Sequence, residues 1–142
     1  MNKQGFTLIE LLLVMVLLSM LVAVAVPVSL RFFKMQIVSD TSTELVDLLR
    51  TAQMFALTQR HNSAYGVKMV ENTFVLFEGE SYAARVTAED VSFPFPNTAT
   101  VSGIDEIVFN QGTGLTAFNG VITVTTLDHV DTVQINPVGS IE

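Results

Sequence analysis

Side chains that could carry out chemistry are few in this sequence of 142 residues. It holds two histidines, His61 and His129, which are too few for a histidine-rich metal site, and it has no cysteine, so thiol chemistry and disulfides are excluded. We expect His61 near the end of a helix, where a capping or dipole role explains a histidine. The residues around His129 fit a polar hairpin tip better than a set of metal ligands.

Carboxylates and glycine loops offer no clearer active site. The available acidic residues lack the dense spacing of a calcium loop, so no calcium site is assigned; they are Asp105, Glu106, Asp128 and Asp131. The loop at residues 112–114 has no following Lys-Ser/Thr pair of the kind that cradles a phosphate, and no nucleophile elbow is present. We therefore expect no enzyme activity, no bound metal and no cofactor.

Charge and hydropathy divide the chain into two parts. The formal net charge is -7 and the mean hydropathy is +0.49. Residues 1–35 contain three basic residues and one acidic residue, whereas residues 36–142 contain four basic and 13 acidic ones. Phosphate binding needs basic surface, so the acidic second part argues against a protein that binds nucleic acid through its overall charge.

The first part predicts a helix that crosses a membrane. Residues 11–30 carry no charge, and as a helix they would span about 30 Å, the thickness of the hydrocarbon core of a bilayer. Ser19 and Ser29 are the polar residues in this run, and Ser19 can bond back to its own helix. Pro27 removes one backbone hydrogen bond, so we expect a bend there. A cleaved secretory signal would have a shorter apolar core.

Glu10 directly precedes the charge-free run and needs an explanation. A carboxylate inside the bilayer costs several kcal/mol unless it is paired. It could lie at the headgroup level, stay protonated, or await a positive partner from another chain. The flanking charges are ambiguous, because Arg31 and Lys34 outnumber Lys3 and by count alone would place the C-terminal part in the cytoplasm.

The residues before the run resemble a known processing site. The segment Gly5-Phe6-Thr7-Leu8-Ile9-Glu10 is similar to the cleavage and methylation site of type IV prepilins and type II secretion pseudopilins. The resemblance implies that a prepilin peptidase cuts after Gly5 on the cytoplasmic side and methylates Phe6. It also implies that the C-terminal domain lies outside the cytoplasm, and we follow it over the charge count. Gln4 departs from the family, where many relatives carry a basic residue.

A second helical pattern follows the apolar run. Apolar residues recur at steps of three and four, with polar residues between them, among which Thr41 and Ser42 are placed on the polar face. This spacing predicts an amphipathic helix that continues without a break to about residues 61–63. Its apolar face, expected to pack on a sheet, comprises Ile37, Val38, Leu45, Leu48, Leu49, Ala52, Phe55 and Ala56.

From residue 65 onward the pattern changes to short strands separated by turns. Glu71-Asn72 and residues 127–129 each predict a hairpin turn. Several short strands with close turns indicate antiparallel sheets, so the fold class is α+β, with a long N-terminal helix packed on an antiparallel β-sheet or β-sandwich domain. The expected strands are 65–70, 73–77, 82–87, 91–95, 98–103, 106–110, 120–126, 131–136 and 140–142.

The C-terminal part resembles one group within the family. The minor pseudopilin H and fimbrial-T proteins combine a long helix with such an antiparallel domain. The resemblance rests on loose apolar and glycine patterns in residues 44–60, 65–70, 107–112 and 133–139.

Together these patterns predict a structural, minor subunit of a type IV pilus-like or type II secretion pseudopilus filament. The expected organisation is a cleaved leader at 1–5, a transmembrane and assembly helix at 6–30, its amphipathic continuation at 31–62, and an extracytoplasmic β-domain at 63–142. Phe6, Glu10 and Pro27 are the expected assembly residues. The implied partners are other pilin-like subunits, the prepilin peptidase, the bacterial inner membrane and its assembly machinery, and no nucleic acid.

Two other functions stay open at this point. The chain could be a DNA-uptake minor pilin that binds DNA directly, for which Lys68 and Arg85 could contribute to a local basic patch. It could also be a single-pass, membrane-anchored binding domain that never polymerises.

Overall fold

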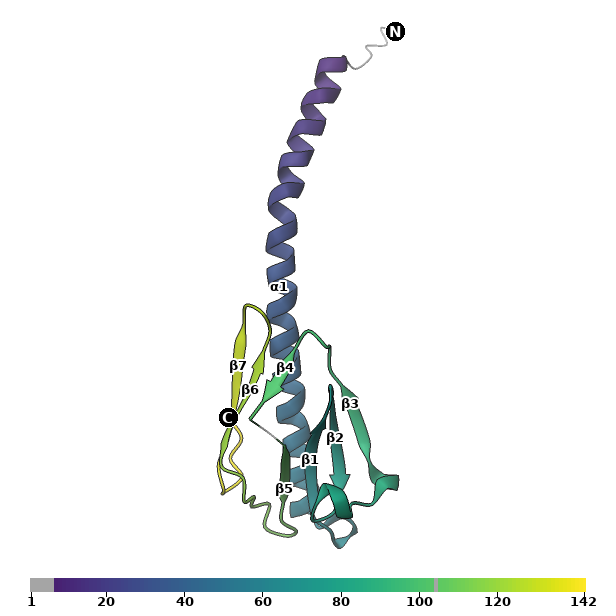
Figure 1. The fold of residues 1–142 in the computed structure, drawn as a ribbon, viewed down its shortest axis with the longest axis vertical. Coiled ribbons are helices and arrows are strands. Elements are labelled where there is room, and N and C mark those ends of the chain that lie inside the picture. The colour runs from purple at the N-terminus through teal and green to yellow at the C-terminus, as the bar shows by residue number, and fades with distance from the viewer. Residues whose placement is uncertain (1–6, 104) are drawn as a thin grey trace.

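One long helix runs the length of the molecule, and two β-sheets surround its second half (Figure 1). The computed structural model describes residues 7–103 and 105–142. Helix α1 spans Leu8–Leu57 and is capped by Thr7, whose side-chain oxygen accepts a hydrogen bond from the backbone N–H of Glu10 at 3.3 Å. Such a hydroxyl satisfies one of the free N–H groups of a helix start. Pro27 lies inside α1 without ending it, and the helix is gently curved.

The predicted end of the helix was four or more residues too late. After Leu57, Gln59 takes a left-handed backbone conformation (φ 53°), and a short 3-10 turn, η1, covers Arg60–Asn62. The backbone N–H of Gly112, in a distant loop, donates to the carbonyl oxygen of Ala56 at 2.8 Å. This contact satisfies a carbonyl at the helix end from outside the helix, so a tertiary interaction stabilises the earlier termination.

The first sheet has four antiparallel strands in the order β3-β2-β1-β5. The hairpin predicted at Glu71-Asn72 is confirmed, with Val70 paired to Thr73. Glu71 supplies the left-handed conformation (φ 54°) that the tight turn needs. The strands are β1 Tyr65–Val70, β2 Thr73–Glu78, β3 Val91–Pro94 and β5 Glu106–Phe109.

The second sheet has three antiparallel strands in the order β4-β6-β7. These are β4 Thr100–Ser102, β6 Gly120–Thr125 and β7 Val130–Ile135. The hairpin predicted between β6 and β7 is confirmed, and its core face is formed by buried residues of both strands. Those residues are Ile122, Val124, Val133 and Ile135.

Two predicted strands were wrong. Residues 82–87 form short 3-10 turns, η2 at Tyr82–Ala84 and η3 at Thr87–Glu89. The Arg85 guanidinium lies 3.7 Å from the centroid of the Tyr82 ring and its Nε donates to Asp90 at 2.7 Å, which folds the segment on itself. The strand expected at 140–142 is reduced to a single bridge between Ile135 and Ile141.

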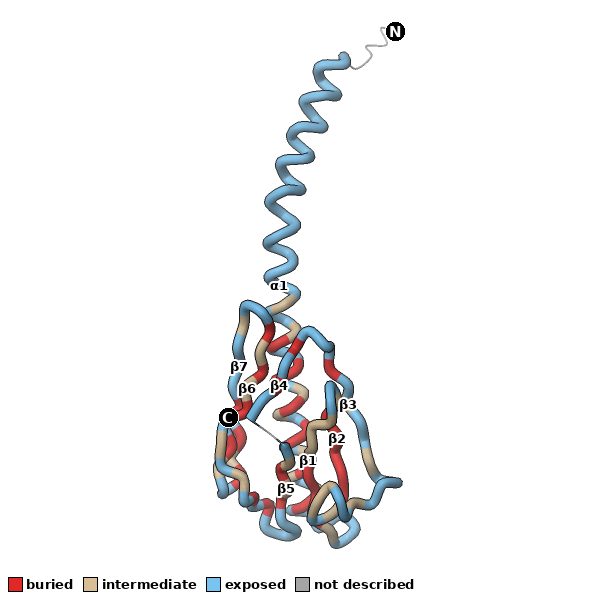
Figure 2. Tube along the Cα trace, in the orientation of Figure 1, coloured by how far each residue is buried: buried red, intermediate tan, exposed pale blue. Residues whose placement is uncertain are grey.

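The core lies where the second half of α1 meets both sheets, as the buried segments in Figure 2 show. Leu45, Leu49, Ala52 and Ala56 are completely buried, which confirms the predicted apolar face. Thr41 and Ser42 were wrongly placed on the polar face, and both are buried. They lie between Val38 and Leu45 at steps of three and four, so they share the buried face. The α+β architecture of a long helix packed on antiparallel sheets is therefore confirmed.

Candidate functional site

The first half of α1 forms an exposed arm that extends away from the two sheets (Figure 1). Every residue from 7 to 33 is exposed, whereas burial begins around Val38 (Figure 2). In the described part of the chain, α1 is the one helix that is long and apolar enough to cross a membrane, and its most apolar window of 18 residues is not buried at all. This arm, residues 7–33, is the candidate functional surface.

Glu10 lies in the first turn of the arm and is exposed. Its neighbours Leu11, Val14 and Leu18 line a shallow apolar groove on the same side of the helix. Gly5 and Phe6, the predicted processing residues, lie outside the residues that the structure describes.

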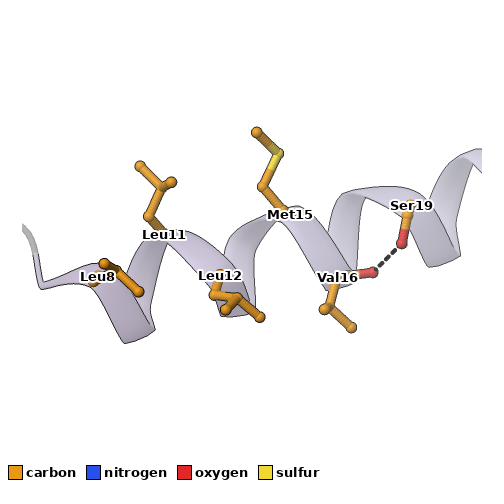
Figure 3. A pocket seen from close by; sticks show the side chains of 6 residues that line it. All are labelled: Leu8, Leu11, Leu12, Met15, Val16 and Ser19. Atoms are coloured by element: carbon orange, nitrogen blue, oxygen red, sulfur yellow. Dashed lines mark hydrogen bonds between the residues drawn. The ribbon is translucent and has the colours of Figure 1, made fainter.

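The arm presents shallow grooves of the kind that a neighbouring helix or lipid chains can fill. Figure 3 shows one lined by six residues, in which Leu11 and Met15 point to one side of the helix and Leu8 and Leu12 to the other. The hydroxyl of Ser19 donates to the carbonyl oxygen of Val16 at 2.8 Å, so this polar side chain of the charge-free run is satisfied within its own helix. Pro27 lies farther along the arm and is exposed as well.

Residues 1–26 match the family model of the prokaryotic N-terminal methylation motif. The chain carries a prepilin-type methylation motif. This motif supports the interpretation of the chain as a type IV pilin-like precursor. The motif occurs at the N-terminus of structural proteins rather than enzymes. With the long apolar helix, it indicates membrane anchoring, processing by a prepilin peptidase and assembly with other pilins. No curated protein and no solved structure matches the chain.

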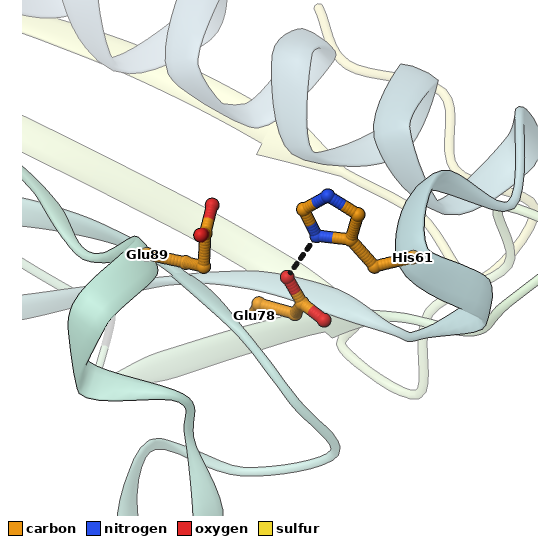
Figure 4. Close-up of side chains that lie close together, drawn as sticks. All are labelled: His61, Glu78 and Glu89. Carbon is orange, nitrogen blue, oxygen red and sulfur yellow. Dashed lines mark hydrogen bonds and ion pairs between the residues drawn. The ribbon is translucent and has the colours of Figure 1, made fainter.

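A polar cluster at the far end of α1 was missed by the sequence analysis. His61 Nδ1 lies 2.7 Å from Glu78 Oε2 (Figure 4). The hydroxyl of Tyr65 donates to the same oxygen at 3.0 Å. The side chain of Glu78 is only 8% exposed. His61 therefore binds a carboxylate of strand β2, and the helix-capping role expected for it was wrong. Its partner lies 17 positions away, so no local pattern could have identified it.

Burial and hydrogen bonding shift the pKa values of this cluster in opposite directions. Burial alone would raise the pKa of Glu78, but hydrogen bonds from His61 and Tyr65 outweigh it and hold the pKa below its usual value. Burial, together with the hydrogen bond to Glu78, raises the pKa of Tyr65 to about 12. Glu78 is thus an ionised, buried carboxylate held by two donors.

The same cluster offers a possible set of metal ligands. The ligand atoms of His61, Glu78 and Glu89 all lie within 4.8 Å of one another, and imidazole with carboxylates suits zinc. However, Glu78 already accepts two hydrogen bonds, and the guanidinium of Arg60 lies 4.0 Å from Glu89. Two of the three ligand groups therefore already have partners within the protein. The arrangement is best explained as an anchor that ties the turn after α1 to strand β2.

The carboxylates considered for calcium do not form one site. Asp105 pairs with Lys68 at 2.9 Å, and Asp128 pairs with Lys34 at 3.1 Å. The remaining two accept backbone hydrogen bonds from different segments: Glu106 from Tyr82, and Asp131 from Thr132.

Both cations that could have contributed to a DNA-binding patch have acidic partners. The ammonium of Lys68 donates a hydrogen bond to the carboxylate of Asp105, and this interaction raises the pKa of Lys68. Arg85 bonds Asp90 at 2.7 Å. Their charges are thus offset locally, which counts against direct phosphate binding at these residues.

Proposed function

We propose that this protein is a minor structural subunit of a type IV pilus-like or type II secretion pseudopilus filament. The observation that carries the proposal is the methylation motif at the head of an exposed apolar arm, joined to a folded domain that leaves this arm free. In this proposal residues 1–5 are removed, residues 6–30 cross the inner membrane, and residues 31–62 continue the helix. The β-domain at 63–142 lies outside the cytoplasm.

The physics of the arm supports assembly through helix packing. Moving the arm from lipid into a bundle of like arms exchanges one apolar environment for another, so the hydrophobic contribution nearly cancels. Charge pairing can then determine the register. After cleavage Phe6 would carry a positive amine, which the carboxylate of Glu10 in a neighbouring subunit can neutralise. Pro27 allows the arm to bend as it packs.

The domain beyond the arm supports a grouping with minor pseudopilin H and fimbrial-T proteins. It combines the second half of a 50-residue helix with two antiparallel sheets of four and three strands. Its acidic composition suits a surface that faces water on the outside of a filament.

Processing is tested by mass spectrometry of the protein isolated from membranes. The expected product begins with an N-methylated Phe6 and lacks residues 1–5. An intact Met1 in cells with an active prepilin peptidase would contradict the proposal.

Assembly is tested by replacing Glu10. Glu10→Val should insert into the membrane at least as well as the original chain, because it removes a costly carboxylate from the bilayer. It should be depleted from filaments, because an amine would remain unpaired in an apolar bundle. The measurement is the fraction of subunit in sheared filaments relative to the membrane pool.

Ser19→Ala is the matched control for that experiment. It changes a polar residue of the same arm, whose hydroxyl donates to Val16 within its own helix. It should enter filaments like the original chain. Equal incorporation of Glu10→Val and Ser19→Ala would show that helix packing alone sets the register, and co-purification with no other pilin-like subunit would contradict the filament proposal itself.

A further inference from the structure

The tip of the β6–β7 hairpin, residues 126–130, folds back toward the free arm (Figure 1). The tip is closed by a hydrogen bond from the backbone N–H of Thr126 to the carbonyl oxygen of His129 at 2.8 Å. The ammonium of Lys34 lies 3.1 Å from the Asp128 carboxylate, which places the tip beside α1. Residues far apart in the sequence therefore meet just beyond the apolar run.

The position of Lys34 along the helix gives the depth of this tip relative to a bilayer. Lys34 is four residues beyond Leu30, the last residue of the charge-free run, which corresponds to about 6 Å of helix. The headgroup region on each side of a bilayer is roughly 5–8 Å thick. With residues 11–30 in the hydrocarbon core, the hairpin tip lies at the headgroup level.

The side chains at that level have the chemistry of a surface that contacts a membrane. Leu127 is 89% exposed and Val130 is 64% exposed, although both are apolar. Phe32 and Phe33 are also largely exposed on the adjoining turns of α1, next to the exposed cation Arg31. Exposed apolar and aromatic residues together with a basic residue are typical of segments that lie at the interface with anionic lipid.

We propose that Leu127, Val130, Phe32, Phe33 and Arg31 form a lipid-binding collar that rests on the headgroups of an anionic bilayer. The inference rests on the membrane anchoring proposed above. Apolar side chains of the collar enter the boundary between headgroups and acyl chains, and Arg31 binds lipid phosphates. The Lys34–Asp128 pair offsets the acidic group at the tip, which would otherwise be repelled by anionic lipid.

Continuity favours lipid over a neighbouring subunit as the occupant of the collar. The collar begins where the membrane-spanning run ends, so the anchored subunit brings it to the bilayer surface without any further partner. It would hold the β-domain in a fixed orientation before extraction, and extraction into a filament would have to release it.

The sequence lacks tryptophan, so a single introduced tryptophan reports alone. Leu127→Trp places the probe in the collar. Val138→Trp is the matched control, since Val138 is 71% exposed in the loop after β7. Its neighbour Gly139 accepts a hydrogen bond from Gln53, which is 19 residues beyond Lys34 and hence about 28 Å farther along the helix. Leu17→Trp probes the middle of the arm.

The full chain is reconstituted in phosphatidylethanolamine–phosphatidylglycerol vesicles that contain acyl chains brominated near the headgroup. Leu127→Trp should fluoresce at shorter wavelength than Val138→Trp and be quenched several-fold more strongly. Replacing phosphatidylglycerol with zwitterionic lipid should reduce this quenching, and unchanged quenching would overturn the role of Arg31.

The three variants separate failure of the collar from failure of the anchor. With lipid brominated deep in the acyl chain, quenching of Leu17→Trp shows that the arm is inserted. If the Leu17→Trp probe is quenched but the Leu127→Trp probe is no more quenched than that of Val138→Trp, the collar is refuted and the anchor stands. If the emission wavelength of Leu127→Trp changes with the protein-to-lipid ratio and not with the lipid composition, the surface contacts a second subunit. That result would also refute the collar. An unquenched Leu17→Trp would overturn membrane anchoring itself.

Discussion

Leu49 gives the most direct test of how α1 joins the β-domain. It is completely buried on the face of α1 that contacts both sheets. Replacing a buried leucine by alanine removes apolar contact and leaves a cavity, at a cost of about 2–5 kcal/mol. Rigid elements surround Leu49 on several sides, so we expect Leu49→Ala to destabilise the domain by about 3 kcal/mol.

The assay is thermal unfolding of the full chain in detergent, followed by near-ultraviolet circular dichroism. A loss of about 3 kcal/mol should lower Tm by roughly 10–20 °C for a domain of this size. Leu49→Asp should prevent folding, because it would place an unpaired charge in the core. Leu17→Ala makes the same substitution on the exposed arm of the same helix and should leave Tm unchanged. A Leu49→Ala protein that loses less than about 1 kcal/mol would refute the packing described for this face.

Three further predictions concern the far end of the domain. Glu78, with its lowered pKa, stabilises the fold above the unfolded-state pKa and loses this contribution as pH falls through the folded-state value; His61→Ala should therefore move acid unfolding to higher pH, whereas His129→Ala should not. Tyr65 has a raised pKa, so its contribution is complete below pH 10 and is lost as pH rises toward about 12. The loss in the free energy of unfolding is at most about 3 kcal/mol. In Tyr65→Phe the free energy of unfolding should change less with pH over that range, as measured by alkaline denaturation curves. Gly139 has φ +80° and no room for a Cβ beside Gln53 and the backbone of Gly114, so Gly139→Ala should cost roughly 1–3 kcal/mol in chemical denaturation; an unchanged midpoint would contradict the tight turn.

Local patterns predicted the elements whose causes are local. The apolar face of α1 follows from the spacing of Leu45, Leu49, Ala52 and Ala56, and the Glu71-Asn72 turn follows from residues on either side of it. These signals lie within a few residues of one another, so they need no knowledge of the rest of the fold. The processing motif at residues 5–10 is also local, and it lies within the 26 residues that match a family model. A short segment was therefore enough to indicate a prepilin-like precursor.

Features that depend on distant contacts could not be predicted in this way. The end of α1 depends on Gly112, which donates to Ala56 from 56 positions away. The turns at Tyr82–Ala84 depend on how Arg85 combines a ring contact with an ion pair. The partner proposed for Glu10 belongs to another chain, so neither the sequence nor the structure of one subunit contains it.

The exposure of the arm sets the strongest constraint on function. Nineteen large apolar side chains between Leu8 and Phe33 are exposed, far more than the isolated patches that soluble monomers leave in water. At about 1.5 kcal/mol or more for each side chain removed from water, covering them is worth on the order of 30 kcal/mol, which exceeds the usual 5–15 kcal/mol stability of a folded domain. The environment of the arm therefore dominates the energetics of the whole chain. Lipid before assembly and like helices after it both meet this requirement, and the pairing proposed for Glu10 is one electrostatic difference that would select between them.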